Sequence, residues 1–178
     1  MGFRTLVVDL TNESLEWTTT PDEVVDQYLG GRGLGIRYLY DNLAPRIDPL
    51  GPDNILSMWT SPVLGTGPIS MVKICAVSKS PATGTILMSL MGGYFGPELR
   101  FAGADALIFK GIASKPTYLL VEDGKAELCS AEHLWGKTTR ETDETLREEL
   151  QLKKMHTNKR KQILKRHLTQ LPQLKFHR

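Results

Sequence analysis

Cysteine is scarce in this chain of 178 residues, and the side-chain groupings that build metal or nucleophilic sites are missing. The two cysteines, Cys75 and Cys129, lie far apart and match none of the paired spacings of zinc or iron–sulfur sites. There is also no HExxH motif and no Ser/His/Asp grouping. His133, the one histidine before residue 150, is expected to be a surface or packing residue. We therefore predict no catalytic residue and no metal ligand in this sequence.

Long apolar runs are also missing. No stretch approaches the roughly 20 apolar residues that a membrane-spanning helix needs, so no span is expected. The N-terminal residues 1–4 lack the charged and apolar regions of an export signal. A chain with two cysteines and no such signal is expected to be a reduced, cytoplasmic protein.

Acidic residues are absent after Glu149, and this absence divides the chain. Residues 1–150 carry 13 Lys and Arg against 20 Asp and Glu, a net charge of −7, whereas residues 151–178 carry nine Lys and Arg and no acid. All 16 glycines lie before residue 137. We predict one domain over residues 1–150 and a basic tail over 151–178, either helical or disordered. A basic amphipathic helix can bind nucleic acid or an acidic membrane, but we favour an adventitious extension.

The most informative stretch that is present runs from residue 58 to residue 111. Its short apolar runs at 74–77, 85–88 and 106–109 are bordered by Gly and Pro, which predicts three buried strands. Glycine-rich turns lie beside them at 65–67, 81–84 and 92–96. Glycine lets a backbone come close to a ligand because no Cβ intervenes. The turns are therefore expected either to cradle a flat or anionic group or to be purely structural.

The flanking segments predict an α+β fold. Strands are expected at 3–10, 15–18, 55–60, 117–122 and 125–129, and helices from Pro21, over 36–43 and over 138–150. The order strand, turn, strand, loop, helix occurs at both ends, so we predict two related sheet-containing halves.

The glycine loop at 31–35 precedes a helix and can bind phosphate. It lacks the G-x-G-x-x-G spacing, however, and we favour a tightly packed helix–helix turn.

Two longer motifs in the stretch from residue 58 to residue 111 resemble those of a known protein family. KSPATG at 79–84 and GGYFGPELRFAGAD at 92–105 resemble the N-terminal domain of the tungsten-containing aldehyde:ferredoxin oxidoreductases, in which a KSPxTG turn is followed by GGxFGxELKFAGxD. LGGRGL at 29–34 and LWGK at 134–137 extend the resemblance over residues 3–150. The family domain is built from two sheet-containing halves related by a pseudo-twofold, and it forms a platform under a tungsten or molybdenum bis-pterin.

The resemblance also implies site residues. Lys73 falls where the family has an arginine that contacts the cofactor, and Gly92 matches a glycine that lies against it, with Met91 and Gly93 beside it. Leu90 falls where an asparagine helps to hold a magnesium ion between the pterin phosphates. Lysine keeps the charge but loses the bidentate fork of arginine, and leucine cannot ligate magnesium. The ligands of the family's [4Fe-4S] cluster do not match Cys75 or Cys129.

The resemblance implies an oxidoreductase that converts an aldehyde to a carboxylic acid and passes electrons through the cluster to ferredoxin. We expect this chain to be the truncated, cofactor-binding part, without activity on its own, missing the C-terminal domains, and prone to self-association through the apolar surface they would cover. The alternatives are a binding module whose basic tail contacts nucleic acid or an acidic partner, and a scaffold fragment without cofactor. The departure at Leu90 favours the scaffold.

Overall fold

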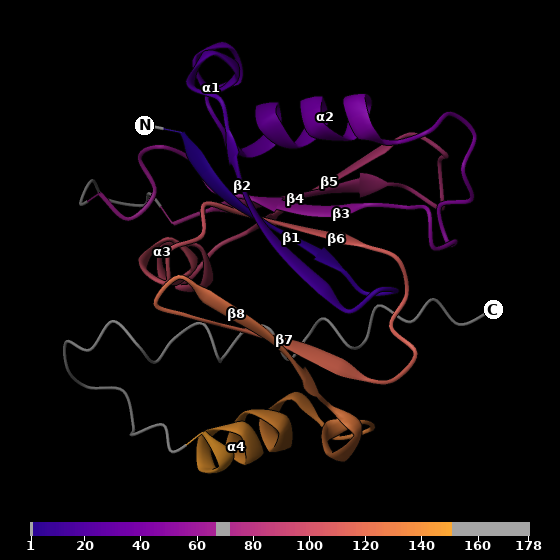
Figure 1. Ribbon diagram of the computed structural model, residues 1–178, viewed down its shortest axis with the longest axis vertical. Helices are drawn as coiled ribbons and strands as arrows, with labels where there is room; N and C mark the ends of the chain where they lie inside the picture. Colours follow the sequence, from indigo (N-terminus) through magenta and orange to yellow (C-terminus); the bar gives the residue numbers. More distant parts are fainter. Residues whose placement is uncertain (1, 67–71, 151–178) are drawn as a thin grey trace.

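A computed structural model of the protein describes residues 2–66 and 72–150. The predicted basic tail at 151–178 and part of the turn at 65–67 lie outside the described residues. Within them, four α-helices, eight strands and one 3-10 helix alternate along the chain (Figure 1). Their order is β1 (Phe3–Asp9), β2 (Ser14–Thr20), α1 (Asp22–Tyr28), α2 (Gly31–Asn42), β3 (Leu56–Trp59), β4 (Ile74–Lys79), β5 (Ile86–Met91), α3 (Phe95–Phe101), β6 (Ala106–Lys110), β7 (Thr117–Glu122), β8 (Lys125–Ser130), η1 (Glu132–Leu134) and α4 (Thr139–Glu149).

Six of these strands form one sheet in the order β2-β1-β6-β3-β4-β5. All neighbours are antiparallel except β1 and β6, which run parallel with Leu6 opposite Leu107. Strands β7 and β8 form a separate two-stranded sheet. The predicted α+β class is confirmed.

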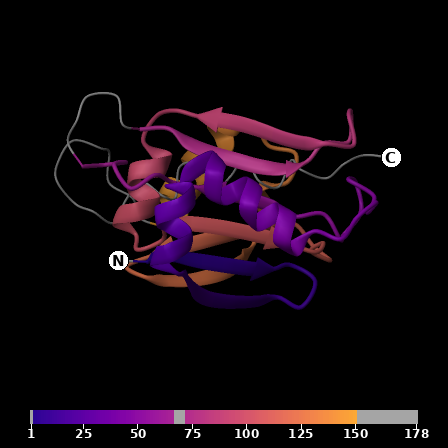
Figure 2. The ribbon, with the colours of Figure 1, turned by 90° about the horizontal axis from the view of Figure 1, so that it is seen from above.

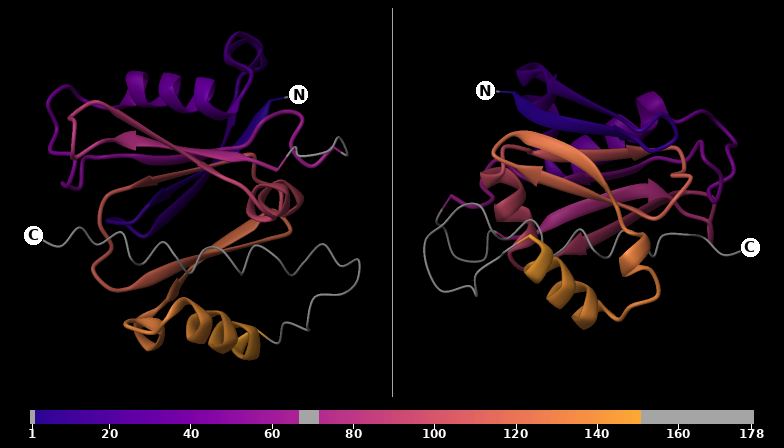
Figure 3. Two further views of the ribbon diagram at one scale, coloured as in Figure 1. Left: turned by 180° about the vertical axis from the view of Figure 1, so that it is seen from behind. Right: turned by 60° about the horizontal axis from the view of Figure 1, so that its bottom comes forward.

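The elements stack in layers (Figures 1 and 2). Helices α1 and α2 cover one face of the large sheet, where Leu34 and Leu39 of α2 join a core cluster with Trp59. Helix α3 and the β7–β8 hairpin cover the other face, where Leu119 and Val121 of β7 join a second core cluster that includes Leu99 of α3. Alternate residues of the same strand face a third cluster that holds α4 through Leu146. The hairpin therefore lies between the large sheet and α4 (Figure 3), with an apolar cluster on each of its two faces.

The two hairpins at the ends of the domain differ in their surroundings. The β1–β2 hairpin belongs to the six-stranded sheet, whereas β7–β8 stands as a sheet of its own. The relationship of two halves by a pseudo-twofold stays a prediction.

Three sequence-based expectations differ from the structure. The run at 85–88 is predicted to be buried, but β5 is exposed along nearly its whole length, because it is the edge strand of the sheet and α2 packs on β3 and β4 instead. The second helix begins at Gly31 rather than at residue 36. The loop after Gly93 contains helix α3, which tolerates Pro97 because the proline lies in its first turn, where its missing N–H leaves no hydrogen bond unmade.

Candidate functional site

The candidate site lies where the β4–β5 ladder ends. The last pair of this ladder joins Ile74 to Met91. Lys73 directly precedes Ile74 and Gly92 directly follows Met91, so the structure brings the lysine and the glycine turn to the same end of two neighbouring strands. Lys73 is exposed. It offers a positive charge beside the turn.

The turn itself presents bare backbone. A Cβ placed on Gly92 or on Gly93 would meet nothing within 4 Å, and both residues are exposed. Gly93 has φ +92°, a conformation that side chains rarely adopt. A flat group can therefore lie directly against this backbone with a cation close by, and in this respect the residues fit an anionic cofactor.

Leu90 and Met91 precede this turn on β5. Leu90 is 55 % exposed and points away from the core, whereas Met91 is partly buried and packs against the cluster beneath α3. The leucine side chain has no oxygen atom, so it cannot supply a magnesium ligand at this position. The chemistry of the residues fits an anion held by Lys73 and the glycine backbone, but not a side-chain magnesium ligand at residue 90.

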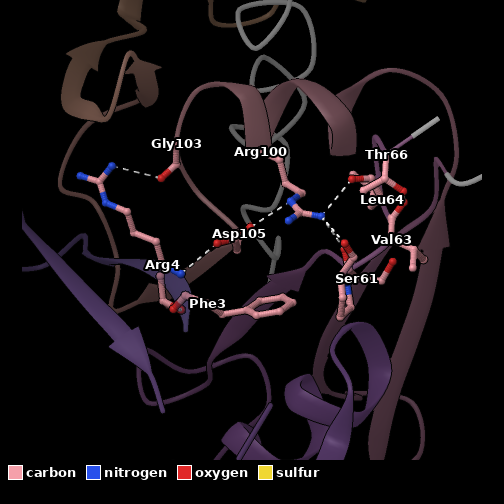
Figure 4. Close-up of polar contacts among 11 residues, drawn as sticks. Phe3, Arg4, Ser61, Val63, Leu64, Thr66, Arg100, Gly103 and Asp105 are labelled. Atoms are coloured by element: carbon pink, nitrogen blue, oxygen red, sulfur yellow. Dashed lines mark hydrogen bonds and ion pairs between the residues drawn. The ribbon is translucent and has the colours of Figure 1, made fainter. Parts of the chain in front are cut away.

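The segment beside the site is held by a residue that sequence reasoning did not single out. The Arg100 guanidinium donates hydrogen bonds to three carbonyl oxygens of the chain after β3, those of Ser61 (3.0 Å), Pro62 (2.7 Å) and Leu64 (3.0 Å) (Figure 4). Its Nε lies 3.1 Å from Asp105 Oδ1. Helix α3, which follows the glycine turn, thereby holds residues 61–64 after β3 in place.

Asp105 joins this arrangement to the N-terminal strand. Its second carboxylate oxygen accepts a hydrogen bond of 2.9 Å from the Arg4 backbone N–H. The Arg4 side chain reaches the carbonyls of Gly103 (3.3 Å) and Gly124 (3.0 Å) and stacks 3.9 Å over the Trp17 ring. Asp105 is therefore engaged by the Arg100 guanidinium on one side and by the backbone of β1 on the other.

The glycine segment at 31–35 is not a loop and is not open. The Gly31 N–H donates to the Thr60 carbonyl at 2.7 Å. A Cβ on Gly35 would lie 2.6 Å from Val77 and 2.9 Å from Trp59. Gly35 lets α2 pack closely on the sheet, so the predicted tight packing is found, but residues 31–35 are the first residues of α2 and not a turn between two helices. The Gly31 N–H is used by Thr60 and is not available to a phosphate.

The remaining titratable candidates do not form a reactive group. Burial raises the pKa of both the Cys75 and the Cys129 thiols, which keeps them protonated near neutral pH and weakens them as nucleophiles. His133 Nε2 lies 2.9 Å from Glu149 Oε2 at the surface. Across residues 2–66 and 72–150, no three His, Cys, Asp or Glu side chains are grouped so that they could hold a metal ion. No helix in these ranges is long and apolar enough to cross a membrane.

Comparison with known protein families gives a match over most of the chain. The model of the aldehyde ferredoxin oxidoreductase N-terminal domain matches residues 5–160. The tungsten-containing aldehyde ferredoxin oxidoreductase of Thermococcus kodakarensis is 39% identical over 153 residues, which are 86% of this chain and 25% of that protein. The aliphatic sulfonate oxidoreductase, WOR-like subunit, of Pyrococcus furiosus is 35% identical over 159 residues, 88% of this chain and 24% of that one.

A solved structure shows the same fold. The active-site complex BamBC of benzoyl coenzyme A reductase, in complex with 1,5-dienoyl-CoA, superimposes with a TM-score of 0.82 and 34% sequence identity. The match covers 86% of this chain and 24% of that chain. The chain thus spans about a quarter of the length of the relatives it matches.

Proposed function

The chain belongs to the aldehyde ferredoxin oxidoreductase family through its N-terminal domain, and from this we propose that it is the cofactor-binding part of a tungsten or molybdenum oxidoreductase. The intact enzyme would oxidise an aldehyde to a carboxylic acid and pass the electrons to ferredoxin through a [4Fe-4S] cluster. The cluster ligands would come from domains that this chain does not include, so the chain alone would be inactive. Two free cysteines support a reducing, cytoplasmic setting.

The observation that carries the proposal is the open end of the β4–β5 ladder in a chain of this family. Gly92 and Gly93 offer bare backbone, and Lys73 stands at the neighbouring strand end. We propose that the turn lies against the pterin and that the lysine ammonium neutralises pterin phosphate charge. Lysine does this as a point charge, without the paired hydrogen bonds of arginine.

The chemistry of oxidation would belong to the bound metal and its pterins, and this domain would bind and orient them. Leu90 and Met91 would contribute apolar contact beside the glycine turn. A magnesium ion at residue 90 would have to rely on backbone oxygens and water, which Mg²⁺ accepts because it keeps several waters when bound.

A scaffold fragment that keeps the fold without the cofactor is the second candidate. Leu90 is the observation that favours it, because an exposed leucine stands where the family has an oxygen ligand. The two candidates differ in one measurable property, which is whether the domain retains pterin and metal.

A chimaera tests this directly. Residues 1–150 would replace the matching N-terminal quarter of the Thermococcus kodakarensis relative, and tungsten and pterin would be measured in the purified protein. We expect the chimaera to hold both, and the substitutions Lys73→Ala and Gly92→Val to reduce both. Lys125→Ala is the control, because this exposed lysine belongs to β8 and not to the β4–β5 ladder that carries the candidate site. If the chimaera is folded but contains no pterin or tungsten, while the unmodified relative purified in parallel contains both, the scaffold candidate is favoured.

A further inference from the structure

Strand β5 leaves one of its edges open. Among the described residues it pairs only with β4. The Ser80 N–H donates to the Thr85 carbonyl at 2.7 Å, which fixes the side of the strand that faces β4 at that residue. Because successive residues of an antiparallel strand alternate in direction, the N–H and C=O groups of Ile86, Met88 and Leu90 face the open edge.

The same three residues form an apolar stripe on one face of the sheet. Ile86, Met88 and Leu90 are 49 %, 40 % and 55 % exposed. They lie on the face that carries α2, but α2 packs over β3 and β4, so the sheet extends one strand beyond its helical cover (Figure 2). Exposed apolar side chains beside free backbone groups favour the addition of another strand.

The two edges of the sheet differ in how they resist such pairing. Strand β2, at the opposite edge, carries Glu16 near its centre and three threonines. Strand β5 has the sequence ILMSLM, with no charged residue and no proline. Natural sheets commonly protect their edges with charges or proline, and of these two edges only β5 lacks both.

The sequence of β5 is also complementary to itself. When two copies run antiparallel with Met88 opposite Met88, Ile86 of each copy faces Leu90 of the other, and Leu87 faces Ser89. This register places the outward-facing backbone groups of both copies opposite one another, and it brings no two like charges together. A twofold axis closes such a pair, whereas pairing of β5 with β2 would continue from copy to copy.

We propose that two copies of this chain associate through their β5 edges as an antiparallel strand pair centred on Met88. The occupant of the open edge is thus a second copy of the chain. The proposal does not depend on cofactor binding and concerns the strand edge, although Leu90 at the end of this edge also borders the proposed cofactor site.

Charge substitutions at the twofold axis test the pairing. The full chain is expected to show a concentration-dependent monomer–dimer equilibrium by sedimentation velocity. Met88→Lys and Met88→Glu should each be monomeric, because like charges then stand directly opposite each other. An equal mixture of the two variants should recover the dimer, since a lysine of one copy then faces a glutamate of the other across the axis. Thr19→Lys, on the exposed β2 edge, should leave dimerisation unchanged.

Several outcomes would overturn the proposal. The first is a wild-type chain that stays monomeric, which would indicate that other domains of the family cover this edge. The second is a dimer that persists in Met88→Lys. The third is the formation of open-ended oligomers that Thr19→Lys abolishes. Circular dichroism of each variant establishes that a monomer is folded, and recovery of the dimer in the mixture excludes unfolding as the cause of dissociation.

Cysteine cross-linking tests the register. Residues directly opposite in a hydrogen-bonded antiparallel pair have Cα atoms about 5.5 Å apart, within reach of a disulfide. Met88→Cys should therefore cross-link on mild oxidation. Ile86→Cys alone should not, but it should cross-link when mixed with Leu90→Cys. The wild-type chain, with Cys75 and Cys129, is the background control, and equal cross-linking of all single variants would contradict the register.

Discussion

Arg100 near the end of α3 and Asp105, in the connection just before β6, form an ion pair with Nε and Oδ1 3.1 Å apart. The chain reverses between them at Gly103, whose φ is +97°. The guanidinium is then aimed at the carbonyls of the 61–64 segment, and the carboxylate at the backbone of β1. One pair of side chains thereby ties β1, α3 and the chain after β3 together.

Removing the guanidinium should destabilise the domain. Arg100→Ala removes a hydrogen-bond donor from three carbonyls, of which that of Ser61 keeps the Leu64 N–H, and leaves a half-buried Asp105 without its cation. We expect the free energy of unfolding to fall by about 2–4 kcal/mol, measured by urea denaturation. Arg140→Ala, which breaks an exposed i,i+4 pair with Glu144, should change it by about 0–0.5 kcal/mol. Equal effects of the two substitutions would contradict this role for Arg100.

A methyl group on Gly35 should also destabilise the domain, although alanine is the better helix former. The added Cβ would lie 2.6 Å from Val77 and 2.9 Å from Trp59 in the layer between α2 and the sheet. Overpacking of this kind costs about 1–3 kcal/mol, more than the gain of about 1 kcal/mol in helix propensity. Thermal denaturation of Gly35→Ala is the measurement. Gly92→Ala, where a Cβ has open space, should leave the melting temperature unchanged.

Much of the fold follows from local patterns in the sequence. The Asp123-Gly124 turn predicts the β7–β8 hairpin, with β7 at its expected bounds and β8 ending one residue later than expected. Pro21 and the acids after it predict the start of α1. These signals depend on residues close together in the chain, where turn chemistry and the helix dipole decide the outcome.

The rest depends on contacts between distant residues. Nothing in the segment at 31–35 shows that its glycines are helical, because the reason is the approach of Trp59 and Val77 from the sheet. The exposure of β5 follows from its place at the sheet edge. At the candidate site, Lys73 and the glycine turn are indicated by the family resemblance, and only the strand register brings them together. Arg100 carries no local signal for its contacts.

The start of α4 offers a test of capping. Thr138 Oγ1 accepts a hydrogen bond from the Glu141 N–H, and the Glu141 carboxylate accepts one of 2.8 Å from the Thr138 N–H. Thr138→Ala should lower the free energy of unfolding by about 1 kcal/mol, the usual contribution of an N-cap. Thr139→Ala, one residue inside the helix, removes no cap and is the control. Chemical denaturation followed by circular dichroism measures both, and an equal loss in the two variants would contradict the capping role.

The buried carboxyl of Glu98 should make stability depend on pH. Desolvation raises the pKa of Glu98 in the folded state above its ordinary value of 4.5. Above the folded pKa the group is ionised in both states and its burial disfavours folding, whereas below 4.5 it is neutral in both and that disadvantage disappears. Glu98→Gln removes the charge at every pH.

We therefore expect Glu98→Gln to raise the melting temperature by a few degrees at pH 7, and the difference from the wild type to shrink as the pH falls through the folded pKa of Glu98. Glu144→Gln, at an exposed carboxylate of α4, should show no comparable gain. Differential scanning calorimetry from mildly acidic to mildly alkaline pH measures both variants. An increment for Glu98→Gln that stays constant over this range would show that the gain comes from packing rather than from the buried charge.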